Sequence, residues 1–202
     1  MIHLLLDALP EHIEADGRRY SVLTDFRDWV QFADMLADRT LTPEERAVAA
    51  LMWVSDPPAQ VTASLVKALL AFYRADGLKP PTEDDDDEED DEEDVEDETQ
   101  DRPPVFDWRV DAAYIVGDFR RYYGIDLLTV EYLHWWEFRA LFEALPEDSG
   151  CMKRIRYRSC DLSKITNKAE RQRIAAIQRQ IRLPWEREEE AFGDALWDSM
   201  MV

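Results

Sequence analysis

The sequence predicts a mainly α-helical protein: a bundle-like helical domain with a small N-terminal β-hairpin and a disordered acidic insert. Three observations lead to this fold class. Apolar residues recur at spacings of three and four over most of the chain, an Asp-Gly pair separates two short runs near the start, and residues 83–98 hold 15 acids in 16 positions. The 202 residues suffice for one compact domain or two small ones, at roughly 100–200 residues per domain.

The hairpin comes first in the chain. Residues 11–15 and 18–22 flank Asp16-Gly17, a pair whose two turn positions both tolerate a positive φ. In this hairpin Ile13 would lie across from Tyr20 and Val22 on one face. The pattern therefore predicts two short antiparallel strands with one apolar side.

Three helices are predicted before the acidic insert. The first covers about 25–37, with apolar residues on one stripe. The second begins at a capping box formed by Thr42 and Glu45 and extends to about residue 55. The third covers 59–75, and Gly77 is expected to end it in a left-handed conformation.

The acidic insert differs in kind from the rest of the chain. Without residues 83–98 the chain has 30 acids against 24 Lys and Arg, a net charge of −6, so most of the formal net charge of −21 belongs to this run. Self-repulsion and a lack of apolar residues predict that residues 79–104 form a disordered linker. The run could alternatively bind a basic partner or mimic a nucleic acid.

Four more helices are predicted after the insert: 108–123, which Gly124 would end, 130–145, a short helix near 151–157, and 167–181. The helix at 130–145, which Thr129 would cap, is apolar on two faces, so we expect it to be mostly buried. The candidate core residues are Trp29, Trp135, Trp136, Phe138 and Phe142.

Four segments describe the predicted domain organisation. Residues 1–78 hold the hairpin and three helices, residues 79–104 are the linker, and residues 105–184 pack with the first half as one domain. Residues 185–202 form a tail helix with Phe192, Leu196 and Met200 on a narrow apolar stripe. A helix this short is marginal alone in water, so the stripe would pack on its own domain or order on a partner.

A basic stretch gives a second candidate for partner binding. Residues 151–182 carry ten Lys and Arg against two acids, a net charge of +8. Arg171, Arg173 and Arg179 are its candidate contact residues. The stretch could bind phosphates, an acidic protein or the chain's own acidic run. The acidity of the whole chain argues against nucleic acid as the partner.

Few residues are placed for chemistry. His134, with Glu131 and Glu137 nearby, could act as a general base, although a structural role among aromatic residues is favoured. Cys151 and Cys160 enclose three arginines, which would lower a thiol pKa if they were close, but no partner histidine accompanies them. Two cysteines in a chain of this length argue against a disulfide framework.

Sequence motifs of enzymes and targeting segments are absent. The chain contains no glycine-rich phosphate loop, no HExxH, no CxxC and no nucleophile elbow. We therefore expect no enzymatic activity, cofactor or metal. The longest uncharged apolar stretch, residues 47–54, is far below the ~18 residues that a membrane helix needs, which predicts a soluble protein.

Three stretches are unusual for a generic helical protein: residues 4–29, 123–149 and 157–171. The block Y-G-I-D-L followed by L-H-W-W-E-F-R-A-L-F is the most specific part. Together these stretches resemble the bacteriophage Gp-fifteen family, small proteins of long-tailed phages and prophages. The similarity covers about 4–75 and 107–184, whereas the acidic insert and the tail are departures from the family.

The resemblance implies a non-enzymatic role in tail assembly. Genes of this family typically lie just before the tape-measure gene, the position of tail assembly chaperones, which are thought to coat the tape-measure protein and to recruit tail-tube subunits. The resemblance thus implies a chaperone in the host cytoplasm that binds either protein and is absent from the mature virion. A homo-oligomer is a further option. The alternatives are a structural tail or virion component and an acidic regulatory mimic that binds a basic partner.

Overall fold

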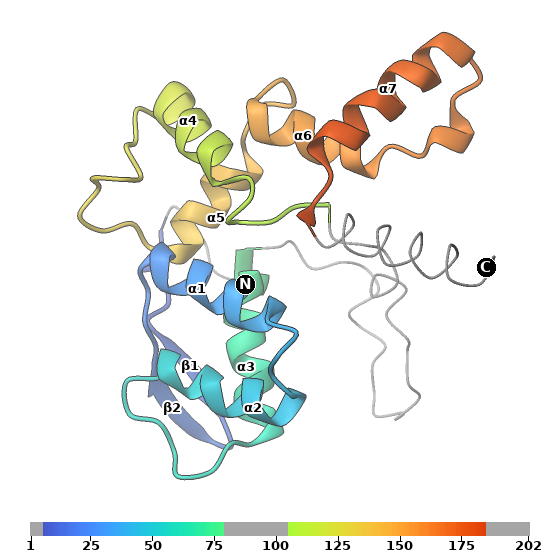
Figure 1. The fold of residues 1–202 in the computed structure, drawn as a ribbon. Helices are drawn as coiled ribbons and strands as arrows, with labels where there is room; N and C mark the ends of the chain where they lie inside the picture. The colour runs from blue at the N-terminus through green and yellow to red at the C-terminus, as the bar shows by residue number, and fades with distance from the viewer. Residues whose placement is uncertain (1–5, 79–104, 185–202) are drawn as a thin grey trace, which may run out of the picture. The chain divides into compact units, whose positions relative to one another are not determined.

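The computed structural model describes residues 6–78 and 105–184 (Figure 1). These residues divide into two compact units, one of residues 6–78 with 129–144 and one of residues 105–128 with 145–184. The predicted fold class, mainly helical with a small N-terminal hairpin, is confirmed. The acidic insert and the tail helix lie outside the described residues, and the packing of both halves as one domain stays a prediction.

The hairpin of the first unit forms as the sequence predicts. Strands β1 (His12–Ala15) and β2 (Arg18–Ser21) are antiparallel, and Ile13 lies opposite Tyr20. Asp16 and Gly17 have φ angles of 52° and 68°, the positive values that a two-residue turn of this kind requires. Ile13 is buried, and β1 packs against the third helix of the unit.

Four helices complete the first unit: α1 (Phe26–Ala37), α2 (Pro43–Ala49), α3 (Ala63–Arg74) and α5 (Trp135–Glu143). The capping box of Thr42 and Glu45 is present at the start of α2. The helix is shorter than predicted, because the chain tightens into a 3₁₀ turn at Ala50–Trp53 and then pairs with the end of the hairpin. The backbone N–H of Ser55 donates to the Ser21 carbonyl at 2.9 Å.

The end of α3 corrects the predicted role of Gly77. Ala75, not Gly77, takes the left-handed conformation, with φ 54°. Residue 77 has to be a glycine because a side chain would collide with Trp136: a Cβ at this position would lie 2.6 Å from its indole ring. The start of α3 is also later than predicted, because Thr62 caps the helix by accepting a hydrogen bond from the N–H of Leu65.

The start of α5 corrects a second prediction. The helix begins at Trp135 rather than residue 130, and its N-cap is His134 rather than Thr129. The residues before it pair instead with the chain that leads into α1. The N–H of Phe26 donates to the Leu133 carbonyl at 2.9 Å, and the N–H of Trp135 donates to the Thr24 carbonyl at 2.7 Å. This pairing joins the first turns of α1 and α5.

Aromatic side chains fill the core of the first unit. Trp29 and Trp135 are completely buried, and the other candidate core residues, Trp136, Phe138 and Phe142, are buried as well. The ring of Trp29 stacks on Phe72 with centroids 4.7 Å apart, and Phe26 stacks on Phe138 at 4.9 Å. The core thus joins α1, α3 and α5, which come from distant parts of the chain.

The adjacent residues Trp135 and Trp136 both donate hydrogen bonds to the C-terminal end of α3. Their indole N–H groups donate to the carbonyls of Tyr73 and Phe72, at 2.8 and 2.9 Å. The last carbonyls of a helix need such external donors. The pair therefore buries two large rings without leaving an indole donor or a helix-end carbonyl unsatisfied.

The second unit contains α4 (Ala112–Tyr123), α6 (Gly150–Ser159) and α7 (Lys168–Ile181). As predicted, Gly124 ends α4 with φ 69°, and Asn167 caps α7. The start of α4 is later than the predicted residue 108. The Asp107 carboxylate accepts hydrogen bonds from the N–H groups of Arg109 and Val110, and these bonds hold a turn before the helix. Within the described ranges, no helix is long and apolar enough to cross a membrane.

Candidate functional site

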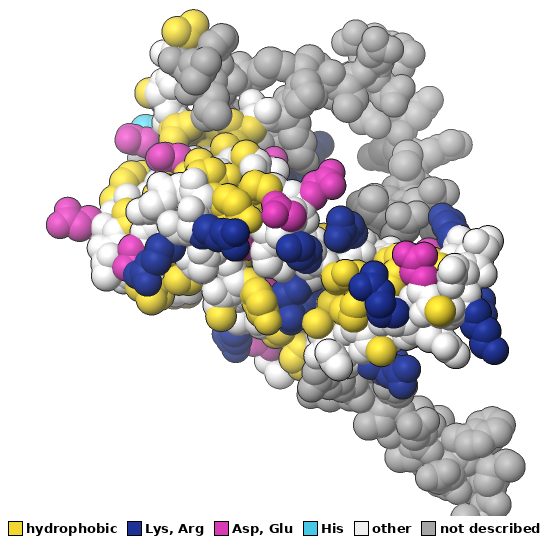
Figure 2. Space-filling model, turned by 90° about the horizontal axis from the view of Figure 1, so that it is seen from above, with side chains coloured by type: hydrophobic (Ala, Val, Ile, Leu, Met, Phe, Trp, Pro, Cys, Tyr) yellow, Lys and Arg dark blue, Asp and Glu magenta, His cyan; other side chains and the backbone are white. Residues whose placement is uncertain are grey.

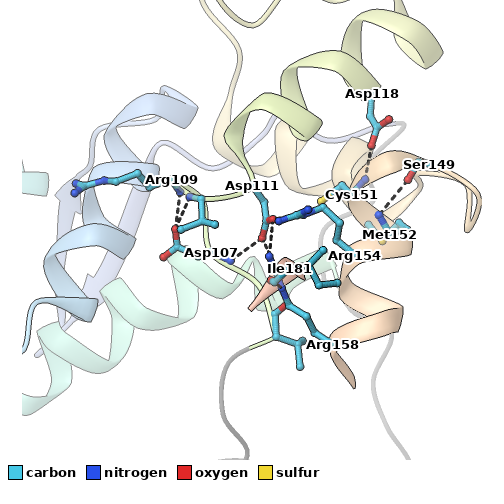
Figure 3. Close-up of polar contacts among 12 residues, drawn as sticks. Asp107, Arg109, Asp111, Asp118, Ser149, Cys151, Met152, Arg154, Arg158 and Ile181 are labelled. Atoms are coloured by element: carbon cyan, nitrogen blue, oxygen red, sulfur yellow. Dashed lines mark hydrogen bonds and ion pairs between the residues drawn. The ribbon is translucent and has the colours of Figure 1, made fainter. Parts of the chain in front are cut away.

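A buried carboxylate organises the second unit (Figure 3). Asp111 is completely buried at the start of α4, between two arginines of α6. Arg154 donates its Nε–H to Asp111 Oδ1 at 2.8 Å, and Arg158 donates from Nη1 to Oδ2 at 2.6 Å and from Nη2 to Oδ1 at 3.0 Å. Two guanidinium groups thus neutralise one carboxylate through charge-assisted hydrogen bonds.

Arg158 also fixes the chain on both sides of this ion pair. Its Nε–H donates to the Ile181 carbonyl at the end of α7, at 2.7 Å, and Nη1 donates to the Val105 carbonyl at 3.1 Å. Burial raises the pKa of Asp111, but the hydrogen bonds from Arg158 and Arg154 outweigh it, so this pKa lies below its ordinary value of 3.8. The cluster holds three elements together and leaves the carboxylate ionised.

The thiol of Cys151 is not activated by these arginines. Cys151 is buried at the start of α6, where the Asp118 carboxylate accepts hydrogen bonds from the N–H of Gly150 at 3.1 Å and of Cys151 at 2.7 Å. Burial, followed by the charges of Asp111 and Asp118, raises the pKa of Cys151 to about 12. Since the thiolate is the nucleophile, a neutral buried thiol does not support covalent catalysis here.

His134 has a structural position. Its Nδ1 accepts a hydrogen bond from the N–H of Trp136 at 3.0 Å, which leaves the proton on Nε2 to donate to the Pro10 carbonyl at 3.0 Å. Burial lowers the pKa of His134, so the ring is neutral. Both ring nitrogens are engaged, which favours the structural interpretation over a general base. Among the described residues, no group of three His, Cys, Asp or Glu could hold a metal ion.

An apolar groove lies between α2 and α3 in the first unit and has a volume of about 720 Å³. Its apolar lining consists of Ala47, Val48, Val61, Ala63, Val66 and Leu70. Val48 is 60% exposed. Lys67 and Arg74 stand on the α3 side of the groove, and Glu44 stands on the α2 side.

The sequence carries a signal for this groove, a second apolar stripe on α3. Leu65, Leu69 and Phe72 form the face of α3 that is buried in the core. Val66 and Leu70, four residues apart, form a second apolar stripe that remains partly exposed. Helix α3 is thus apolar on two faces and buries only one of them in the core.

A basic face covers α7 in the second unit. Of the predicted contact residues of the basic stretch, Arg171 and Arg179 are exposed on the same side of this helix as Lys168. Arg173, two residues after Arg171, is exposed on the opposite side of the helix. Figure 2 shows Lys and Arg side chains gathered over the end that carries α7, with few acidic side chains among them. The other predicted contact residues, Phe192, Leu196 and Met200, lie outside the described residues.

A recess of about 240 Å³ adjoins this face, between the end of α6 and α7. Arg158, Arg179 and Arg182 line it together with Gln178. The Gln178 side-chain amide donates to the carbonyls of Tyr157 and Cys160, both at 2.8 Å, and so ties α7 to the end of α6. The two helix segments that carry the arginines of the recess are therefore joined by hydrogen bonds.

Comparison with known proteins gives one result. The model of the family described as Bacteriophage Gp15 protein matches residues 5–183. No curated protein and no solved structure matches the chain.

Proposed function

Since the chain belongs to the Bacteriophage Gp15 protein family, a family of phage structural or assembly proteins, we propose that it is a non-enzymatic tail assembly chaperone. In this proposal it binds apolar helical segments of the tape-measure protein before the tail is built, and it presents the complex to tail-tube subunits. An elongated helical protein exposes apolar stripes that aggregate unless another protein covers them.

The observation that carries this proposal is the apolar groove between α2 and α3. A helix in such a groove is recognised through apolar residues spaced at i, i+3 or i+4, and i+7. Helix α3 has 12 residues and is therefore about 18 Å long, which accommodates roughly three turns of a partner helix. Val66 and Leu70 supply the central contact surface on α3.

The charges beside the groove specify which helices fit best. Lys67 and Arg74 are seven residues apart on α3, or about 10 Å along its axis. A partner helix with acids at i and i+7 beside its apolar stripe would match both cations. Such rim pairs contribute little affinity, but they set the orientation and register of the bound helix.

Co-purification with fragments of the tape-measure protein from the same phage tests the proposal. Val66→Gln with Leu70→Gln should reduce capture of helical fragments at least ~10-fold, the effect of losing about 1.4 kcal/mol of binding free energy. Leu128→Gln is the matched control, because Leu128 is 72% exposed and does not line the groove. Circular dichroism checks that both variants fold. Equal capture by the groove variant and the control would contradict the proposal.

Two further measurements test whether the chain is a chaperone or a structural tail component, and whether its tail takes part in binding. A chaperone should be absent from purified virions, whereas a stoichiometric amount there would make the chain a structural tail component. Truncation after Pro184 tests whether Phe192, Leu196 and Met200 contribute to capture. We expect the truncated chain to fold and to bind its cargo more weakly.

A further inference from the structure

The basic face of α7 carries exposed arginines that form no ion pair with the described acids. Within the described part of the chain, Arg171 and Arg179 form no ion pair, and both are exposed. Of the ten Lys and Arg of residues 151–182, Arg154 and Arg158 pair with the buried Asp111, and Lys164 pairs with Asp161. A surface of this charge attracts an acidic partner.

The acidic run rejoins the described chain beside this face. Val105 is the first described residue after the insert, and its carbonyl accepts a hydrogen bond from Arg158 at 3.1 Å. The same guanidinium donates to the carbonyl of Ile181, the last residue of α7. Arg158 also lines the recess with Arg179 and Arg182. The chain that leaves the acidic run is thus fixed at the C-terminal end of α7.

Distance permits the acids to reach all of α7. Glu98, the last acid of the run, precedes Val105 by seven residues, which span at most about 24 Å when extended. Helix α7 has 14 residues and is therefore about 21 Å long. The nearest acids can reach the far end of the helix, and the other acids of residues 83–98 add further length.

From these observations we propose that the basic face of α7 and its recess bind the chain's own acidic segment, residues 83–98. The segment acts as a tethered polyanion that occupies the arginines and excludes other polyanions from them. Individual exposed ion pairs are each worth less than ~1 kcal/mol, but the short tether gives the segment an effective concentration on the order of millimolar. The inference is independent of the chaperone role.

Zero-length carbodiimide cross-linking of the full chain, read by mass spectrometry, tests the contact. Lys164 and Lys168 should form amide links to acids of residues 83–98, and exposed Lys67 on α3 is the internal reference. We expect at least ~5-fold more links at Lys168 than at Lys67 in ~20 mM salt, and loss of this excess in ~0.5 M salt, where the screening length is only a few ångströms. Equal labelling of both lysines would overturn the proposal.

Matched charge variants give a second criterion. Arg171→Gln with Arg179→Gln should reduce the Lys168 links several-fold, whereas Arg18→Gln with Arg19→Gln removes the same charge from two exposed positions of β2 and should not. The links should form within single chains at any protein concentration. Links found only in cross-linked dimers, or links that persist in the α7 variant, would overturn the proposal.

Heparin retention tests the consequence without cross-linking. Replacement of residues 82–100 by a Gly/Ser linker of equal length should expose the basic face, so that this variant is retained on heparin at low salt while the full chain is not. Adding Arg171→Gln and Arg179→Gln to the variant should abolish retention. Equal behaviour of the full chain and the linker variant would show that the segment does not cover the face.

Discussion

The two units of the chain bury different kinds of groups at their centres. In the first unit the completely buried side chains include Trp29 and Trp135, and their polar N–H groups donate to backbone carbonyls. In the second unit a completely buried carboxylate, Asp111, is paired with two arginines. One unit therefore depends mainly on apolar burial, and the other depends on keeping a buried charge neutralised.

Helix composition explains the difference. Helix α5 buries four of its nine residues, whereas α7 buries only Ile174 among 14 and α6 buries only Cys151 among ten. The second unit therefore has fewer large apolar contacts within its helices, and its arginines contribute hydrogen bonds that join separate elements instead. The two units should respond to different substitutions and to different pH ranges.

The largest effect is expected from Asp111→Asn. The change leaves two largely buried guanidinium groups without their carboxylate, and breaking a buried pair costs about 3–5 kcal/mol of unfolding free energy. Urea unfolding followed by circular dichroism at pH 7 measures this loss. Asp126→Asn is the control, because its ion pair with Arg120 is partly exposed and its loss should cost less than ~1 kcal/mol. Equal effects would show that the buried ion pair contributes no more to stability than the pair of Asp126 and Arg120 does.

Trp135→Ala should have a comparable effect on the first unit. The side chain is completely buried, so its removal loses apolar burial, leaves a cavity and costs about 3–5 kcal/mol. The neighbouring Tyr132 is 54% exposed, and Tyr132→Ala should cost no more than about 1 kcal/mol. The same urea titration decides between them. A stable Trp135→Ala variant would refute the aromatic core as the main source of stability.

Replacing two glycines by alanine should change the stability of the chain in opposite directions. Gly77→Ala places a Cβ against the Trp136 ring and should cost about 1–3 kcal/mol through overpacking. Gly117 lies inside α4 with open space at its Cβ position, so Gly117→Ala should stabilise the chain by about 0.5–1 kcal/mol. Thermal unfolding should show a lower Tm for the first variant and a higher Tm for the second. Shifts of the same sign would contradict the packing described at Gly77.

The smallest effects concern pH, and the two units should differ in their ranges. The pKa of His134 is lowered by burial, so its contribution is complete above 6.5, the ordinary value, and is lost as the pH falls toward the folded value. The pKa of Asp111 is also lowered, so its contribution is complete only above 3.8 and is lost in more acidic solution.

Unfolding free energies measured from pH 7 to pH 3 separate the two contributions. His134→Asn keeps a side-chain acceptor for the α5 cap and should flatten the profile below pH 6.5 without changing the acid end. Asp111→Asn should flatten the acid end. A His134→Asn profile that is identical to that of the natural chain would show that the histidine does not titrate on unfolding.

Local sequence signals determined several elements of this fold. The Asp16-Gly17 turn and the capping box of Thr42 and Glu45 appear as predicted. The end of α4 at Gly124 and the start of α7 at Asn167 do so as well. Each of these signals acts within a few residues, through a φ preference or a side chain that bonds the adjacent backbone. The burial of the Trp135 and Trp136 pair also follows from a helix that is apolar on two faces.

Tertiary structure alone decided the rest. The start of α5 depends on hydrogen bonds between residues more than a hundred positions apart, such as Trp135 and Thr24, which no local pattern encodes. Gly77 is needed because of the Trp136 ring, and Asp111 meets Arg154 and Arg158 only when α4 and α6 pack together. Which apolar stripe of α3 enters the core and which remains as a groove is likewise set by packing, because burial depends on the neighbours that a folded chain supplies.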